Sequence, residues 1–379
     1  MTSQPMWHNA RKILCVRLDN LGDVLLTSPA LRALKAFNPG AELALLTSHM
    51  GAGIARLIPE IDDVITFDVP WVKIDGAAGA DAIFDLVARL RAAPFDAAIL
   101  FTVFSQNPLP AALVCYLAGI PLRLGYSREN PYHLLTDWVP DPEPLAGIRH
   151  EVLRQLDLVR TIGAETPGTR LSLNVPVVDR AQALDKLAQA GVDPAGRWLV
   201  LHPGVSEIKR QYPPDAYAAA ARELARQGYT IVLTGVESEH GLAAQIAQAV
   251  GKRALNLAGA LSLGELIGLI SAAPLLIANN TGPIHIAAAV GTPVVVLYAH
   301  TNPQHTPWQV PHRVLYFDVP EHLRSRNVLL DYTYRQTVAQ PVHDAQPADI
   351  VAAVHDLLAE TGRERAPLAA DTRSERRLT

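Results

Sequence analysis

Residues 276–298 read LIANNTGPIHIAAAVGTPVVVLY, and this stretch decides the predicted fold. A first apolar run gives way to a turn at Thr281 and Gly282, and a second apolar run covers residues 294–298. Pro283 favours a helix between the two runs, because the N–H group that proline lacks would have no partner in the first helical turn. The stretch therefore predicts one βαβ unit with both strands buried.

The turn of this unit predicts a phosphate site. A helix that begins after small and polar residues leaves backbone N–H groups and the positive end of its dipole free for a negatively charged oxygen. The candidate phosphate-binding residues are Asn280, Thr281, Gly282 and Pro283, with His285 as a packed or phosphate-facing imidazole. The same residues also suit an ordinary strand-to-helix turn, in which Asn and Gly serve backbone geometry alone.

Strand-length apolar runs alternate with helical stretches along the rest of the chain, as is typical of parallel sheets covered by helices on both faces. The alternation occurs twice, which predicts an α/β protein with two doubly wound, Rossmann-like domains that face each other across a cleft. The predicted strands span residues 12–18, 42–46, 64–67, 97–101, 198–201, 230–234, 254–257, 276–279, 294–298 and 314–317. The predicted helices span residues 24–37, 54–57, 80–91, 109–117, 149–162, 180–190, 214–226, 240–250, 263–271, 283–290 and 348–359.

The length of 379 residues also favours two domains over a single core. We predict an N-terminal domain at residues 11–170, a C-terminal domain at 171–345, a C-terminal helix at 346–361 and a disordered, charged tail at 362–379. Ligands of such sheets bind beyond the carboxyl ends of the strands. The first strand-to-helix loop and the turn described above should therefore face one cleft.

Composition narrows the class of protein. With 33 Lys and Arg against 37 Asp and Glu, the net charge is 33 − 37 = −4, which does not favour nucleic acid as a partner. Cys15 and Cys115 each lie in an apolar stretch, as expected for buried thiols in a reducing compartment. The amino-terminal residues lack the apolar core of a signal peptide, so we expect a cytoplasmic protein.

Asp23 is the candidate catalytic residue of the first half. It follows the first predicted strand, where its carboxylate could remove a proton from a substrate hydroxyl as a general base. Alternatively, an aspartate at that position could have no catalytic role and only stabilise the start of the helix through the helix dipole. Asp19 lies in the same loop and is the competing carboxylate.

Two loops of the second half are candidates for binding a nucleotide. The first carries His202, Gly204 and Ser206 and leads to Lys209 and Arg210, either of which could pair with a diphosphate or simply be solvated. The second loop carries Gly235 and Glu237. It could surround a base or a ribose, or it could only begin the following helix.

Other kinds of site are not indicated. His285, His300 and His305 do not form a His-x-x-x-His pair and have no neighbouring cysteines, so we expect no metal. The chain also lacks the Gly-x-Ser-x-Gly turn of serine hydrolases and the Gly-x-x-x-x-Gly-Lys-Ser/Thr loop of P-loop enzymes.

Three segments together resemble the bacterial ADP-heptose heptosyltransferases of glycosyltransferase family 9. Residues 17–31, RLDNLGDVLLTSPAL, look like the amino-terminal Gly-Asp signature of that family. Residues 280–294, NTGPIHIAAAVGTPV, look like its carboxy-terminal Asp-Thr/Ser-Gly-Pro-x-His signature. The loop from His202 to Lys209 is similar to the one that holds a phosphate-binding lysine. The similarity extends from about Lys12 to Leu358.

The resemblance implies the GT-B architecture, with the acceptor held mainly by the first domain, a nucleotide-sugar held by the second, and no cofactor or metal. It implies that Asp23 is the general base of an inverting transfer, while Lys209 and the N–H groups of Thr281 and Gly282 stabilise the departing diphosphate. This chain departs from the family at Asn280, where aspartate is usual; the amide can still hydrogen-bond sugar hydroxyls but carries no charge.

The implied partners are an ADP-sugar donor and a saccharide or lipid-linked saccharide acceptor, such as lipopolysaccharide core. A local basic patch could bring the protein to the cytoplasmic face of the inner membrane; its residues would be Arg89, Arg91, Arg123 and Arg128. A nucleotide-sugar 2-epimerase of the same architecture and a non-catalytic nucleotide-sugar-binding protein are the alternative functions.

Overall fold

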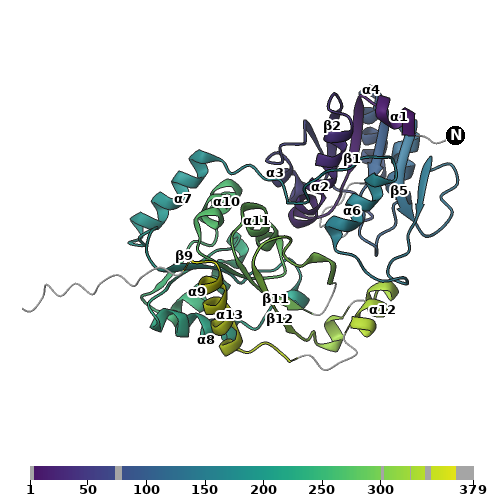
Figure 1. The fold of residues 1–379 in the computed structure, drawn as a ribbon. Helices are drawn as coiled ribbons and strands as arrows, with labels where there is room; N and C mark the ends of the chain where they lie inside the picture. The colour runs from purple at the N-terminus through teal and green to yellow at the C-terminus, as the bar shows by residue number, and fades with distance from the viewer. Residues whose placement is uncertain (1–3, 73–78, 300–302, 325, 338–342, 364–379) are drawn as a thin grey trace, which may run out of the picture.

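The computed structural model describes residues 4–72, 79–299, 303–324, 326–337 and 343–363. Two parallel β-sheets form the centres of two halves of the molecule, and helices cover both (Figure 1). His300 and the predicted tail beyond residue 363 lie outside the described residues.

The first sheet has six strands in the order β3-β2-β1-β4-β5-β6. They are β1 (Lys12–Val16), β2 (Glu42–Thr47), β3 (Asp63–Thr66), β4 (Ala97–Leu100), β5 (Leu122–Ser127) and β6 (Asp137–Pro140). The helices of this half are α1 (Gln4–Asn9), α2 (Leu21–Phe37), α3 (His49–Ala55), α4 (Ala80–Ala92), α5 (Leu109–Leu117) and α6 (Glu151–Arg160).

The second sheet also has six strands, in the order β12-β11-β10-β7-β8-β9. They are β7 (Trp198–His202), β8 (Thr230–Leu233), β9 (Ala254–Asn256), β10 (Leu276–Asn279), β11 (Val294–Ala299) and β12 (His312–Phe317). The helices that follow residue 176 are α7 (Val177–Gln189), α8 (Pro214–Arg226), α9 (His240–Val250), α10 (Leu263–Ala272), α11 (Gly282–Val290), α12 (Val328–Thr337) and α13 (Pro347–Glu360).

The two sheets have the same topology. Renumbered from its own first strand, each sheet reads 3-2-1-4-5-6, the order of dinucleotide-binding folds, and every strand pair is parallel. The chain reverses direction across each sheet between β1 and β4 and between β7 and β10. Ligands bind at such switch points, so the fold places one potential binding crevice at the carboxyl end of each sheet.

The βαβ unit at residues 276–298 is formed as predicted. β10 and β11 pair in parallel and are buried throughout. Helices cover both faces of such a strand, which explains why its sequence is an almost continuous apolar run. Gly291 ends α11 in the left-handed conformation, with φ of 80°, which only glycine adopts at little cost.

Some predicted boundaries are wrong. α2 begins at Leu21, three residues earlier than predicted, so Asp23 lies inside its first turn and not in the loop before it. α3 covers His49–Ala55 rather than residues 54–57, because Ser48 caps it by accepting a hydrogen bond from the backbone N–H of Gly51. The sequence also gave no prediction for β5, β6, α1 or α12.

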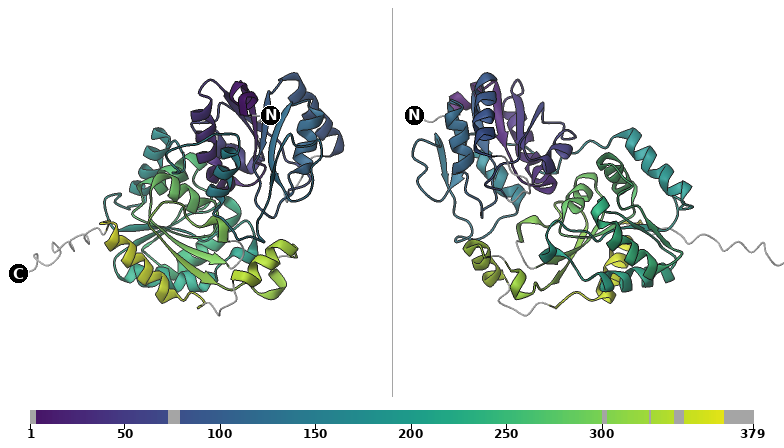
Figure 2. Two further views of the ribbon diagram at one scale, coloured as in Figure 1. Left: turned by 45° about the vertical axis from the view of Figure 1, so that its right-hand side comes forward. Right: turned by 180° about the vertical axis from the view of Figure 1, so that it is seen from behind.

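The predicted domain boundaries stay predictions, although each half has its own apolar layers. α6 packs against α2, whereas α7 packs against α10 and α13 against α8. The two halves meet where α2 and α11 contact each other (Figures 1 and 2). Helix α7 packs on α10, on the side that faces away from α11 (Figure 1). Among the described residues, no helix is both long and apolar enough to cross a membrane.

Candidate active site

The N-terminal ends of α2 and α11 abut across the boundary between the halves. A Cβ atom on Gly22 would lie 2.5 Å from Cδ2 of His285, and one on Gly282 would lie 3.1 Å from Cδ2 of Leu21. A side chain at Gly22 would therefore force the two helix ends apart, whereas the contact at Gly282 is only tight. The two loops with which these helices begin consequently face one shared space.

A cavity of about 450 Å³ opens at the switch point of the second sheet, beside this contact. Loops that follow β7, β8, β9 and β10 form most of its wall. All but one of the predicted site residues line it: Asp23, His202, Gly204, Ser206, Gly235, Glu237, Asn280, Thr281, Gly282, Pro283 and His285.

Lys209 is the exception. It lines an adjoining cavity of about 320 Å³, and its Nζ atom lies 2.7 Å from Oε2 of Glu207. Arg210 lines both cavities and, among the described residues, is the only lysine or arginine that lines the larger one. The structure therefore brings Arg210, rather than Lys209, to the space beside the α11 turn.

Asp23 lies between the two cavities and lines both. Its Oδ1 atom is 3.2 Å from Nη2 of Arg17, a fully buried residue at the end of β1. Arg17 also contacts Oδ2 of Asp19 at 2.9 Å and Oε1 of Glu151 at 2.7 Å. One guanidinium thus holds three carboxylates at the switch point of the first sheet, in keeping with the fixed fork geometry of arginine.

The environment moves the pKa values of the two loop carboxylates apart. Burial raises the pKa of Asp19 to about 6, against the opposing effect of Arg17. Burial would also raise the pKa of Asp23, but the charge of Arg17, assisted by His305 and His285, lowers it below its ordinary value. Asp23 is therefore ionised at neutral pH, which a general base requires.

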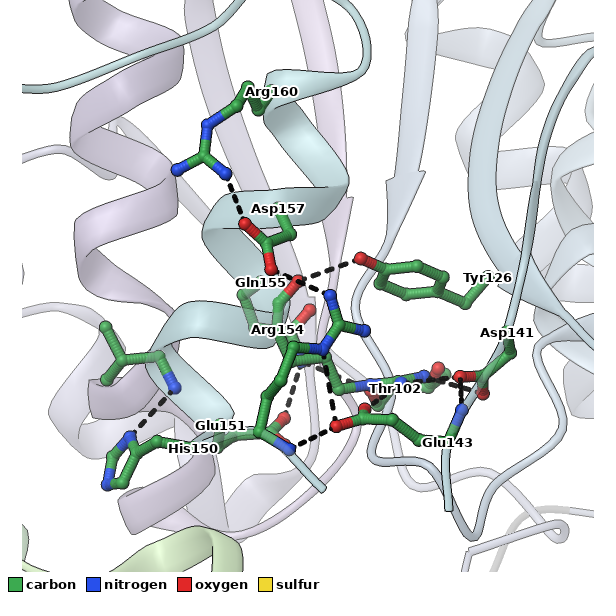
Figure 3. Close-up of polar contacts among 12 residues, drawn as sticks. Thr102, Tyr126, Asp141, Glu143, His150, Glu151, Arg154, Gln155, Asp157 and Arg160 are labelled. Atoms are coloured by element: carbon green, nitrogen blue, oxygen red, sulfur yellow. Dashed lines mark hydrogen bonds and ion pairs between the residues drawn. The ribbon is translucent and has the colours of Figure 1, made fainter. Parts of the chain in front are cut away.

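The side chains of α6 support this cluster from behind. Glu151 accepts a hydrogen bond from Arg17 at 2.7 Å, and the amide of Gln155 donates to Thr102 O at 3.1 Å. Arg154 donates to both carboxylate oxygens of Asp141, at 2.8 and 3.0 Å, and also to Glu143 (Figure 3). Glu151, Arg154 and Gln155 are all fully buried, so this network fixes α6 against the first sheet.

On the opposite side, the α11 turn is held by its neighbours. Asn279 accepts from the backbone N–H of Tyr212 at 3.0 Å and donates to Pro203 O at 2.7 Å, which fastens the 203–212 loop to β10. The side chain of Asn280 is hydrogen-bonded to the Tyr298 hydroxyl. Burial lowers the pKa of His285 to about 3, so its imidazole is neutral.

The wall of the larger cavity contains two glutamates, of which the sequence indicated only one. Glu237 lines it as predicted, and Glu239 joins it. A Cβ atom on Gly204 would come 2.0 Å from the Glu239 carboxyl group, so a larger residue at this position would displace that carboxyl group. Carboxylates at this place in a nucleotide-binding fold can accept hydrogen bonds from ribose hydroxyls.

The sequence reasoning missed the contribution of Arg17, Glu151 and Gln106. Gln106, in the loop after β4, donates a hydrogen bond to Asp19. A charged residue in the apolar run that forms β1 is the one signal that could have identified Arg17. Glu151 is 134 positions away from Arg17, and no local pattern connects the two.

The predicted basic patch is wrong at Arg123. This residue is only 7% exposed, and its guanidinium donates to Leu134 O and His133 O, both at 2.8 Å. Its side chain is used to satisfy carbonyl groups and cannot face a lipid surface. No group of three or more His, Cys, Asp or Glu side chains suited to a metal occurs in the described part of the chain.

Two Rossmann-like sheets with facing switch points define the GT-B class of glycosyltransferase folds, and solved structures agree. The chain superposes on a glycosyl transferase family 9 protein from Veillonella parvula with a TM-score of 0.74 at 19% identity, covering 92% of this chain and 97% of that one. The Escherichia coli ADP-heptose lipopolysaccharide heptosyltransferase II gives a TM-score of 0.70 at 23% identity, over 93% and 99% of the two chains.

The family follows from the sequence match. The model of glycosyltransferase family 9 (heptosyltransferase) matches residues 83–326, and the chain belongs to this family of transferases. The lipopolysaccharide heptosyltransferase 2 of Salmonella typhimurium is 26% identical over 93% of this chain and 99% of the relative. The lipopolysaccharide heptosyltransferase 3 of Escherichia coli K12 is 29% identical over 76% and 82%.

Proposed function

We propose that the protein is an inverting glycosyltransferase that moves heptose from ADP-heptose to a saccharide of the lipopolysaccharide core. One observation carries this proposal: Asp23 lies between two adjoining cavities and lines both, at the contact between α2 and α11. The relatives named as lipopolysaccharide heptosyltransferases support the choice of donor and acceptor.

The larger cavity would hold the ADP-sugar. Its diphosphate would lie at the N-terminus of α11, where the backbone N–H groups of Thr281 and Gly282 and the helix dipole favour negative charge. Arg210 would supply the positive charge, and Glu237 and Glu239 would bind the ribose. Lys209, the cation implied by the family resemblance, would need to leave Glu207 to take part.

Asp23 would act as the general base. The acceptor hydroxyl would give its proton to the carboxylate while its oxygen forms a bond to the anomeric carbon from the face opposite the diphosphate. The bond from that carbon to the phosphate oxygen would break, and ADP would leave with the electron pair. The step needs no cofactor or metal in this scheme, because N–H dipoles and a cation at the second switch point would meet the departing charge.

The test is transfer from ADP-heptose to lipopolysaccharide that lacks heptose, followed by ADP release and by the mass of the product. Asp23→Asn should reduce the rate by about 10²-fold or more, since it removes the base without changing its size. Asp19→Asn, in the loop just before α2, is the matched control and should be much less affected. A larger loss in the Asp19 variant would assign the base to Asp19.

Two other outcomes would overturn the proposal. Conversion of the donor without any acceptor, with the sugar epimerised rather than transferred, would identify a nucleotide-sugar 2-epimerase. Stabilisation of the protein by ADP-heptose with no turnover in any condition would identify a binding protein, because ligands of the native state raise its stability whether or not they react. Stabilisation by UDP-sugars but not by ADP-sugars would change the donor.

A lipid-linked acceptor would bring the protein to the cytoplasmic face of the inner membrane as a peripheral protein. Anionic vesicles should then carry it upward in a flotation assay at low salt, and salt should release it if charge drives the contact. Absence from the floating fraction at low salt would remove membrane contact from the proposal, with the transfer reaction unaffected.

A further inference from the structure

A segment of the second half reaches across to the first half beside Asp23. Residues 303–309 follow β11, and Thr306 O lies 2.9 Å from Nε2 of His150. The ring of Trp308 stacks on His150 with centroids 4.4 Å apart, and its Nε1 donates to Thr169 O at 2.7 Å. The segment is therefore fixed to residues that precede the second sheet in the chain.

His305, at the end of the short 3₁₀ helix Pro303–His305, faces the carboxylates of the first half. Its Nε2 atom lies 3.6 Å from Oδ1 of Asp23 and 3.9 Å from Oε2 of Glu151. Within the described residues, neither His305 Nε2 nor Glu151 Oε2 has a hydrogen-bond partner, although both are buried. Contacts to His150 and Thr169 hold the segment in place, and a small shift of the His305 imidazole toward either carboxylate would turn the distance into a hydrogen bond.

The contacts of Asp23 are one-sided. Arg17 and His305 both approach its Oδ1 atom, whereas no ion pair or hydrogen bond between described residues involves Oδ2. A carboxylate held in this way presents its second oxygen in a fixed direction. That oxygen is the one available to an acceptor hydroxyl.

We infer that His305 is a positioning residue for the catalytic base: the second half supplies it, and it orients Asp23 from across the boundary between the two halves. This inference rests on the proposed function and adds a residue to it. The family signatures at residues 17–31 and 280–294 do not include His305.

The segment is also connected to the donor side. The Tyr298 hydroxyl is hydrogen-bonded to the backbone of His305 and to the side chain of Asn280 in the α11 turn. The α11 turn and the backbone of His305 therefore share one hydroxyl as a hydrogen-bond partner. Donor binding and the orientation of the base share one physical path through Asn280, Tyr298 and His305.

The effect on pH dependence has a definite sign. Burial lowers the pKa of His305, so its imidazole is neutral at pH 7 and carries one N–H group. The groups that face it are the carboxylates of Asp23 and Glu151 and the cations Arg17 and Arg210, with His150 and His285 nearby. In its protonated form, which acidic pH favours, His305 helps to lower the pKa of Asp23, so removal of the imidazole should move the acidic limb of the activity profile to higher pH.

The experiment compares His305→Ala and His305→Gln in the full chain, with ADP-heptose and heptose-deficient lipopolysaccharide as substrates. His305→Ala should lower kcat by about 10- to 100-fold, with KM for ADP-heptose within about twofold of the wild type. Gln carries an N–H donor of similar reach, so it should recover most of kcat. His343→Gln, an exposed histidine on the second half, is the control for substitution alone.

A double-variant cycle separates this inference from the proposed function. If His305 acts through Asp23, adding His305→Ala to Asp23→Asn should cause no further loss of the residual rate. Loss of activity in Asp23→Asn together with wild-type rate and pH profile in His305→Ala would overturn the inference alone. A raised KM for the donor with an unmoved acidic limb would also overturn it. Full activity of Asp23→Asn would overturn both.

Discussion

Replacement of Arg17 by methionine tests the buried ion cluster most directly. The methionine side chain has a length similar to that of the aliphatic part of arginine, but it leaves Asp19, Asp23 and Glu151 without their shared cation. Arg17 is fully buried, and the three carboxylates lie 2.7–3.2 Å from its nitrogens. Breaking a buried pair by removing one partner costs about 3–5 kcal/mol of unfolding free energy.

A domain of this size loses about 2–4 °C of Tm per kcal/mol, so Arg17→Met should lower the Tm of the first half by ~6–20 °C. Without the guanidinium, burial should raise the folded-state pKa values of Asp19 and Asp23 above their unfolded values. Such groups stabilise the fold at low pH and lose that contribution as pH rises through the folded pKa. The loss of stability relative to the wild type should therefore be largest near pH 8 and smaller near pH 5.

Thermal unfolding followed by circular dichroism measures Tm, and urea denaturation at pH 5 and pH 8 measures the loss of unfolding free energy at each pH. Arg17→Lys is the matched control, because it retains the charge but cannot contact three carboxylates in the arginine geometry; it should fall between the wild type and Arg17→Met. A loss below about 1 kcal/mol, or one that is the same at both pH values, would refute the idea that Arg17 neutralises a buried carboxylate cluster.

Two further substitutions test the contact between the halves and the donor cation. Gly22→Ala would ordinarily favour α2 by up to about 1 kcal/mol, but the new Cβ would stand 2.5 Å from the buried ring of His285. We expect kcat/KM to fall about tenfold or more with unchanged far-ultraviolet circular dichroism, and an unchanged kcat/KM would show that the halves need not approach so closely. Arg210→Ala should weaken ADP binding, measured by calorimetry, more than Lys209→Ala, because Lys209 is paired with Glu207; the reverse order would return the diphosphate to Lys209.

The alternation of strands and helices was sufficient to predict the parallel sheets, because buried parallel strands need continuous apolar runs. It failed for β5 and β6, where the runs Leu122–Ser127 and Asp137–Pro140 contain arginine, glycine, aspartate and proline. β6 is an edge strand, where proline is tolerated since one side of the strand has no neighbour to receive an N–H.

The start of α2 shows why the site was only partly predictable. Leu21, Gly22 and Asp23 read as loop residues, since glycine and aspartate are poor helix formers. They are helical because Asn20 ends the extended chain and Gly22 must lie against His285, a contact made across 263 positions of sequence. The motif located Asp23, but only the fold could show that Arg17 and His305 contact its carboxylate.

The two halves share a strand order yet differ in charge at their switch points. At the switch point of the first sheet, Asp19 and Asp23 surround one arginine. At the switch point of the second sheet lie a helix N-terminus, a neutral His285 and Arg210. A displacement reaction needs a proton acceptor at the attacking oxygen and positive potential at the leaving group. One topology used twice can meet both needs only if the loops at its two switch points differ, and in the first sheet the buried Arg17 holds the carboxylates of Asp19 and Asp23 in place.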